Sequence, residues 1–247
     1  MPDATGAFQI LPGESTLRKL GLIGGMSWVS TRTYYEHLNR IIQARTSPLA
    51  SAPLLIESLD FTDLVRLSTP QQWDHAATVL CDSARRLEQA GATALIIGAN
   101  SMHKVHDKVA ASVSIPVLHI ADCVGRRMQA AGVKNAVLLG TRNVMLESFY
   151  RQRLVAHGIS LMPPVMDNVE EIDRIIYEEL MLGKATRGAE RTFKTLITVM
   201  DQAGAEAVVL GCTELEMVID VDANVLPIYD GTRIHAEAAA DWILGGE

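Results

Sequence analysis

The chain has 247 residues, of which 48% are hydrophobic, and a formal net charge of −7 at pH 7. This length accommodates one large domain or two small α/β lobes with a sizeable core. An acidic balance without a basic run makes nucleic acids and anionic membrane surfaces poor partners, and no run of about 18 apolar residues is present that could span a membrane.

The three cysteines are Cys81, Cys123 and Cys212. An odd and sparse set of this kind favours reduced thiols in the cytoplasm over a disulfide framework. The chain has no C-x-x-C pair, and the close pair His103 and His106 has no carboxylate or thiol at ligand spacing. The sequence therefore predicts no metal site.

The first half of the chain alternates short apolar strands with amphipathic helices. Residues 1–16 lack a basic segment followed by an apolar one, so we expect a loose leader and not a secretory signal. Strands are expected at 20–23, 54–58, 94–97 and 116–120, and helices from 30 or 31 to 42 and at 73–90, 103–111 and 122–131.

The second half repeats this alternation. Strands are expected at 136–139, 159–162, 207–210 and 225–228, and helices around 146–154 and at 169–182, 190–202 and 234–244. Three stretches match between the halves, namely 22–25 with 138–141, 96–99 with 209–212, and 116–122 with 225–230. Such a long-period repeat predicts two pseudo-symmetric, Rossmann-like α/β lobes with parallel sheets. We expect residues 1–120 and 231–247 to form the first lobe and 121–230 the second.

Cys212 follows an apolar strand directly, after Gly211. Open α/β sheets bind their ligands beyond the carboxyl ends of the strands, so this thiol lies where such a fold keeps its chemistry. The matching strand in the first half ends in Gly98, Ala99 and Asn100 and offers no thiol. Because the two lobes would face each other, the strand ends are expected to border one cleft for a small ligand.

Several of these segments resemble the cofactor-independent aspartate/glutamate racemase family, over nearly the whole chain from about Leu20. The opening, Gly21 to Trp28 with Thr31, Tyr34, Tyr35 and Asn39, is similar to the family's first segment. Asn100 to Val105 resembles the end of its motif Cys-Thr-Asn-Thr-Met-His-Lys, and Gly211 to Glu214 resembles its second active-site motif. His119 to Asp122 and Leu139 to Thr141 also fit.

The resemblance implies a cleft between lobes in which two thiols flank the α-carbon of an amino acid, without pyridoxal phosphate or metal. Cys212 would be the catalytic acid/base, since a thiolate is a competent base near neutral pH. A homodimer is also implied. The substrate-binding residues expected from the motifs and the strand ends are Met26, Asp60, Asn100, Ser101, Lys184, Thr213 and Glu214.

This sequence departs from the family at the first motif, where Gly98 occupies the position of the partner thiol and Ala99 that of the next hydroxyl. Shifting the internal alignment by one residue restores no thiol. Three functions are then open. The first is an aspartate/glutamate-type racemase in which Ser101, His103 or a water completes the relay. The second is a one-thiol decarboxylase or lyase resembling arylmalonate decarboxylase, and the third is an amino-acid-binding protein without turnover.

Overall fold

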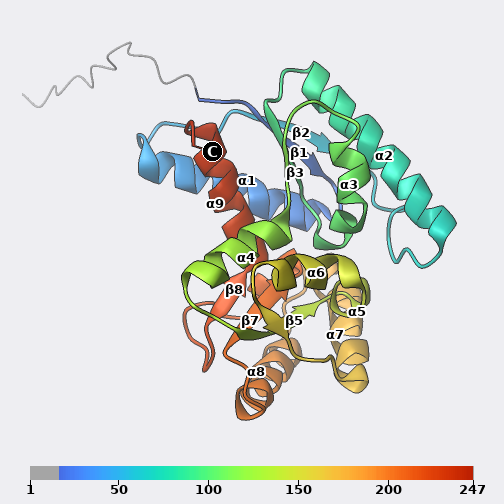
Figure 1. Cartoon of the computed structure of the whole chain (residues 1–247), viewed down its shortest axis with the longest axis vertical. Helices are drawn as coiled ribbons and strands as arrows, with labels where there is room; N and C mark the ends of the chain where they lie inside the picture. Colours follow the sequence, from blue (N-terminus) through green and yellow to red (C-terminus); the bar gives the residue numbers. More distant parts are fainter. Residues whose placement is uncertain (1–16, 247) are drawn as a thin grey trace, which may run out of the picture.

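The computed structural model describes residues 17–246, so the expected leader at 1–16 lies outside the described residues. Two four-stranded parallel sheets, each covered by helices, form two lobes stacked end to end (Figure 1). The predicted α/β class with two parallel-sheet lobes is therefore confirmed. Among the described helices, none has the length and apolar character needed to cross a membrane.

The first sheet has the strand order β2-β1-β3-β4. Its central strands β1 and β3 are buried along their whole length, which explains why they are continuous apolar runs and not alternating ones. The elements of this half are β1 (Leu20–Gly24), α1 (Trp28–Arg45), β2 (Leu54–Ser58), α2 (Pro70–Gln89), β3 (Ala94–Ile97), the 3₁₀ helix η1 (Asn100–Val105), α3 (His106–Ala110) and β4 (Val117–Leu118).

The second sheet repeats this topology with the order β6-β5-β7-β8. Its elements are α4 (Ile120–Ala130), β5 (Asn135–Gly140), α5 (Arg142–Leu146), α6 (Ser148–Ala156), β6 (Ser160–Leu161), α7 (Met166–Glu178), the 3₁₀ helix η2 (Leu180–Leu182), α8 (Arg187–Gln202), β7 (Ala207–Gly211), the 3₁₀ helix η3 (Thr213–Met217), β8 (Ile228–Asp230) and α9 (Gly231–Ile243). The matching strand orders bear out the internal repeat seen in the sequence.

Two helices cross between the lobes. Helix α4 follows the first sheet but packs Val124 and Met128 into the core of the second sheet. Helix α9 follows the second sheet but packs Ala236, Ala239 and Ile243 into the core of the first. The two helices also contact each other at the centre of the molecule (Figure 1). The division of the chain at residues 120 and 230 stays a prediction.

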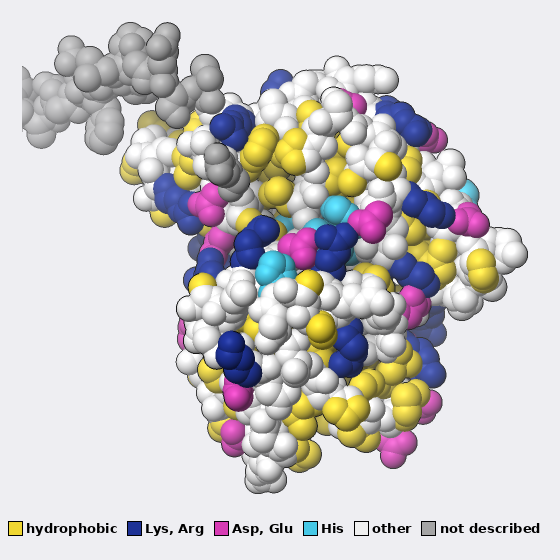
Figure 2. All heavy atoms as spheres, viewed as in Figure 1, with side chains coloured by type: hydrophobic (Ala, Val, Ile, Leu, Met, Phe, Trp, Pro, Cys, Tyr) yellow, Lys and Arg dark blue, Asp and Glu magenta, His cyan; other side chains and the backbone are white. Residues whose placement is uncertain are grey.

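Charged and histidine side chains gather along the boundary between the lobes, where Figure 2 shows them as a band across the middle of the molecule. Arg153 on α6 donates to Asp107 of the first lobe at 2.7 Å and to Asp122 on α4 at 2.8 Å. Lys104 on η1 pairs with Glu147 at the start of α6, at 2.5 Å. The pairs of Lys104 and Asp107 hold η1 and α3 of the first lobe against α6 of the second.

The structure differs from the expected elements mainly at helix ends and at the last strand. Helix α1 begins at Trp28, because Ser27 caps it by accepting from Ser30 N–H. The helix expected at 103–111 is a 3₁₀ turn followed by the short α3. The strand expected at 225–228 is instead β8 at Ile228–Asp230, after Pro227, which has no N–H for a sheet ladder.

Candidate active site between the two lobes

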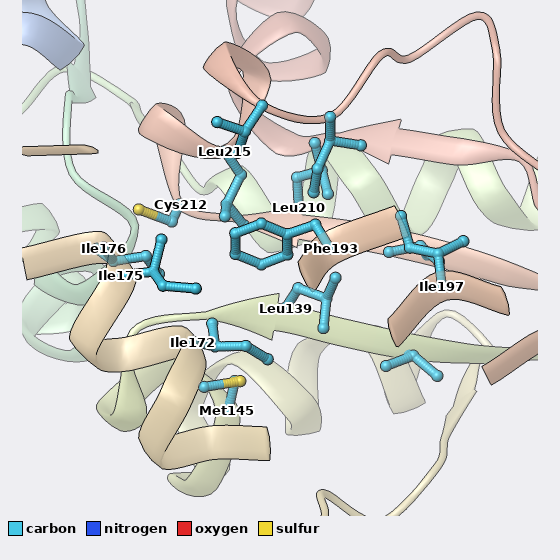
Figure 3. Close-up of a cluster of buried hydrophobic side chains, with 14 of the residues drawn as sticks. Leu139, Met145, Ile172, Ile175, Ile176, Phe193, Ile197, Leu210, Cys212 and Leu215 are labelled. Atoms are coloured by element: carbon cyan, nitrogen blue, oxygen red, sulfur yellow. The ribbon is translucent and has the colours of Figure 1, made fainter. Parts of the chain in front are cut away.

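Cys212 occupies the first position after β7 and caps the 3₁₀ helix η3 in an extended conformation. The residue is only 5% exposed. It lies at the edge of the hydrophobic cluster of the second lobe, and its sulfur is directed away from Phe193 (Figure 3). The thiol is thus held by a rigid strand end and faces away from the core of its own lobe.

A buried carboxylate accepts a hydrogen bond from this thiol. Cys212 Sγ donates to Glu214 Oε2 at 3.1 Å. The other oxygen, Oε1, accepts from Ser27 Oγ at 2.7 Å and from Ser30 Oγ at 2.9 Å, both at the start of α1 in the first lobe. The two serines fix Glu214 and leave Oε2 for the thiol, so the Cys212–Glu214 pair is built from both lobes.

The surroundings of Cys212 disfavour its ionised form. Burial raises the pKa of the thiol well above its usual range, and the negative charge of Glu214 raises it further. In this arrangement Cys212 is a protonated thiol at neutral pH. It can give a proton to a bound molecule directly, whereas removing a proton first requires transfer of its own to Glu214 or stabilisation of the thiolate by a cationic ligand.

The strand register identifies the residue of the first lobe that corresponds to Cys212. Gly98 N–H donates to Ile23 C=O at 2.8 Å and so continues β3, as Gly211 completes β7. Ala99 then precedes η1 with φ −148° and ψ 122°, close to φ −150° and ψ 129° at Cys212 before η3. Ala99, and not Gly98, therefore has the backbone position equivalent to that of Cys212.

A side chain at Gly98 would also be crowded by its neighbours. A Cβ atom there would lie 3.1 Å from Leu22 Cδ1 and 3.2 Å from Ile23 O, which is tighter than ordinary contact. The internal repeat in the sequence already paired Ala99 with Cys212, whereas the family motif placed the missing thiol one residue earlier. The equivalence with Ala99 is the one that the backbone supports.

Two buried polar side chains near these strand ends have no hydrogen-bond partner in the described chain. They are Asn100, at both Oδ1 and Nδ2, and Thr141, at Oγ1. Thr141 follows Gly140, whose partner across the sheet is Gly211, so it lies beside Cys212. Helix η1, which begins with Asn100, contacts α5, which Thr141 caps. Buried polar groups without partners are rare in proteins and mark a place where a ligand can bind. Thr141 was part of a matched motif but was not predicted as a site residue.

The other predicted binding residues fall into two groups. Ser101 is half-buried on η1 beside Asn100, and Thr213 is buried on η3, where its Oγ1 accepts from Thr232 Oγ1 at 3.2 Å. Met26 is also buried, but it packs into the hydrophobic cluster of the first lobe. The structure does not bring Asp60 and Lys184 into this buried group.

Asp60 and Lys184 are both exposed at the surface. Asp60 Oδ1 accepts from the N–H and the hydroxyl of Thr62, which is a local turn interaction. Lys184 follows the left-handed Gly183 at the end of η2, and η2 contacts η3, so the lysine lies near the rim of the Cys212 turn. Of the two, Lys184 is the better placed to meet a ligand.

Four histidines cluster around His103, which lies on η1. The ring of His103 lies 4.6 Å from that of His119, 5.5 Å from His235 and 5.9 Å from His106, measured between centroids. Both ring nitrogens of His103 are buried without a partner in the described chain. Burial and the neighbouring histidines hold the pKa of His103 well below its usual range, so it is a neutral imidazole and a weak candidate for a general acid at neutral pH.

Comparisons with known proteins agree on one family. The sequence pattern of the family Asp/Glu/Hydantoin racemase matches residues 23–239. A crystal structure from Yersinia pestis, of a protein proposed to be an Asp/Glu racemase, has 38% sequence identity, covers 92% of this chain and 99% of its own, and superposes with a TM-score of 0.84. An aspartate racemase homologue from Pyrococcus horikoshii has 30% identity, the same two coverages and a TM-score of 0.80.

A curated relative is more distant. The broad specificity amino-acid racemase RacX of Bacillus subtilis is 22% identical over 175 residues, which are 71% of this chain and 75% of RacX. The matched pattern extends over both lobes and includes Ala99 and Cys212.

Proposed function

Because this chain belongs to the Asp/Glu/hydantoin racemase family, we propose that it catalyses proton transfer at the α-carbon of an amino acid, with Cys212 as the acid/base. The observation that carries this proposal is the grouping of the Cys212–Glu214 pair with the unpartnered side chains of Asn100 and Thr141. An aspartate- or glutamate-like substrate is the favoured class, and Lys184 at the rim is the candidate partner for a second carboxylate.

The proton is taken from the substrate in two coupled steps. Glu214 Oε2 accepts the Sγ proton of Cys212, and the thiolate then removes the α-proton as the Cα–H bond breaks. The positive ammonium group of the substrate offsets the burial that raises the pKa of the thiol, so binding itself helps to form the base. Glu214 stays oriented throughout by Ser27 and Ser30.

The electron pair left on the α-carbon delocalises into the substrate carboxylate. Donors already fixed around the carboxylate stabilise this charge without reorganising. Asn100 Nδ2 and Thr141 Oγ1 are such donors, because each is buried and has no competing partner in the described chain. In the return step, the Cys212 thiol gives a proton back to carbon and recovers its own from Glu214.

The opposite face of the substrate has no second thiol in this proposal. The position equivalent to Cys212 carries the methyl group of Ala99, which can neither donate nor accept a proton. Racemisation then requires another group, such as Ser101 or a water, to give and take the proton on that face. This exchange is slower, because a neutral hydroxyl is a poor base. Proton exchange on one face is therefore expected to be faster than inversion.

Proton NMR in deuterated water tests the proposal. The purified protein is incubated separately with L- and D-aspartate and L- and D-glutamate, and the α-proton signal and the enantiomeric composition are followed. The proposal is supported if one enantiomer loses its α-proton faster than either enantiomer is converted into the other. A Cys212→Ser variant that exchanges as fast as the original protein would contradict it.

The same absence of a second thiol favours one alternative, a one-thiol decarboxylase. Here the C–C bond to a carboxylate of a 2-substituted malonate breaks, carbon dioxide leaves, and the Cys212 thiol protonates the carbanion on one face. Release of carbon dioxide with a product of single configuration, but no α-proton exchange of amino acids, would select this activity.

Cytoplasmic location and homodimerisation remain predictions.

A further inference from the structure

A histidine and two carboxylates converge where α1, η3 and β8 meet. They come from three elements, His37 on α1, Glu216 on η3 and Asp230 at the end of β8. One ligand atom of each lies within 4.8 Å of the others, and His37 Nε2 is 3.1 Å from Glu216 Oε2. Ligands about 2.1 Å from a divalent ion are separated by about 3 to 4 Å, so the three side chains need only small adjustments to share one ion.

Hydrogen bonds from elsewhere orient one oxygen of each carboxylate, while the other oxygen of Glu216, Oε2, lies 3.1 Å from His37 Nε2. Thr33 Oγ1 donates to Glu216 Oε1 at 3.2 Å, and the N–H groups of Thr232 and Arg233 donate to Asp230 Oδ1 at 2.9 and 3.3 Å. Asp230 is only 4% exposed, yet within residues 17–246 no donor reaches its Oδ2. An oriented carboxylate with one available oxygen is the usual arrangement around a bound metal ion.

The cluster opens into a cavity of about 710 Å³. Its walls carry further carboxylates, Glu190, Asp220 and Asp222, beside the cations Lys194 and Arg233. A cavity of this size admits a hydrated ion. The site therefore has an access path as well as ligands.

We propose that His37, Glu216 and Asp230 bind one divalent cation. One imidazole with two carboxylates suits Zn²⁺ or Mn²⁺ better than Mg²⁺, which prefers oxygen ligands alone. The ion would join α1 of the first lobe to η3 and β8 of the second. Its ligand on η3, Glu216, lies four residues after Cys212. Its role is structural, because the proposed proton transfer uses Cys212 and Glu214 and needs no metal.

Metal titration of the untagged full chain tests this site. After treatment with a chelator and its removal, Zn²⁺ and Mn²⁺ are titrated by calorimetry, and the melting temperature is measured with and without each ion. We expect about one ion per chain and a higher melting temperature with Zn²⁺ or Mn²⁺ than with Mg²⁺. Failure of both Zn²⁺ and Mn²⁺ to bind at submillimolar concentration would overturn the proposal.

Two variants and two matched controls locate the binding. His37→Ala and Glu216→Gln are each expected to weaken binding by more than about tenfold. His75→Ala removes an exposed histidine elsewhere, and Glu190→Gln removes a carboxylate from the same cavity, so both should bind as the original chain does. Equal losses in the controls would refute the assignment. If His37→Ala does not fold, Glu216→Gln with Glu190→Gln decides alone.

Discussion

At the scale of single residues, the two sides of the proposed site differ by one side chain. Ala99 and Cys212 have matching backbone conformations at the ends of equivalent strands, so a thiol at residue 99 would have the same support as the one at 212. Gly98 differs because its Cβ direction meets Leu22 Cδ1 and Ile23 O. This contrast supplies a pair of variants that separates the two positions.

Ala99→Cys is expected to raise the rate of racemisation by at least about tenfold, since a thiol on the second face is a far better proton donor and acceptor than water. Gly98→Cys is expected to give no gain and to lower the free energy of unfolding by about 1–3 kcal/mol through overpacking. Chiral chromatography of aspartate and urea denaturation measure the two effects. A gain in Gly98→Cys without one in Ala99→Cys would show that the family motif, and not the strand register, locates the position.

The charge of Glu214 also sets the pKa of the Cys212 thiol. Burial is the largest cause that raises this pKa, and the negative charge of Glu214 is the next. Glu214→Gln removes this charge, so the thiolate should form at lower pH than in the original chain. The same change removes the proton acceptor, so exchange of the α-proton should slow. Thiolate absorbance during a pH titration, with Cys212→Ser to subtract Cys81 and Cys123, measures the first effect. An unchanged or higher titration midpoint would contradict it.

At the scale of elements, helix α1 links the lobes through its first turn. Ser27 Oγ accepts from Ser30 N–H at 3.3 Å and donates to Glu214 at 2.7 Å, so one side chain both caps the helix and orients the active-site carboxylate. Thr69 caps α2 in the same manner, with a capping box to Gln72, but it is exposed, and among residues 17–246 its side chain bonds only within its own helix start. The two caps thus isolate the contribution of the contact between lobes.

Ser27→Ala is expected to cost about 1–3 kcal/mol of unfolding free energy, from a lost cap and a lost buried hydrogen bond, and also to slow α-proton exchange. Thr69→Ala should cost about 1 kcal/mol and leave exchange unchanged. Urea denaturation and the NMR exchange assay provide both measurements. Equal effects of the two substitutions on exchange would mean that Ser27 does not position Glu214.

The sequence predicted the strands better than the contacts between elements. The central strands are continuous apolar runs closed by glycine, so their places follow from local composition, and Cys212 follows from the end of one of them. The contact between Ser27 and Glu214 was not predicted, because these residues lie 187 positions apart and only the packing of the two lobes brings them together. His37, Glu216 and Asp230 likewise share no local pattern, and only the packing of α1, η3 and β8 unites them.

At the scale of the whole molecule, the buried histidines between the lobes make the free energy of unfolding depend on pH. His119 precedes α4 and His235 lies on α9, the two helices that cross between lobes, and both rings are close to His103. Burial lowers the pKa of His119 to about 2 and that of His235 to about 3, so both are neutral in the folded chain throughout the usual pH range. Unfolding releases them to titrate near 6.5.

The sign of the effect follows from proton binding. Above pH 6.5 these histidines are neutral in both the folded and the unfolded chain, so their contribution to the free energy of unfolding does not depend on pH. Below 6.5 the unfolded chain binds protons that the folded chain cannot, so each such histidine should reduce the free energy of unfolding by about 1.4 kcal/mol per pH unit. Asp230 opposes this in part, because burial and the charge of Glu216 raise its pKa to about 6 and it takes up a proton on folding.

We therefore expect the stability to fall steeply from pH 6.5 to about 5. His119→Asn removes one titrating ring and keeps the cap of α4, since Asn accepts the Ala121 N–H as His119 Nδ1 does. Its slope of unfolding free energy against pH should be shallower by about 1.4 kcal/mol per unit. Urea denaturation across this range measures the slope, with the exposed His75→Asn as control. A slope that His119→Asn leaves unchanged would mean that this cluster does not govern acid unfolding, and that protonation of carboxyl groups in the ion pairs between the lobes does.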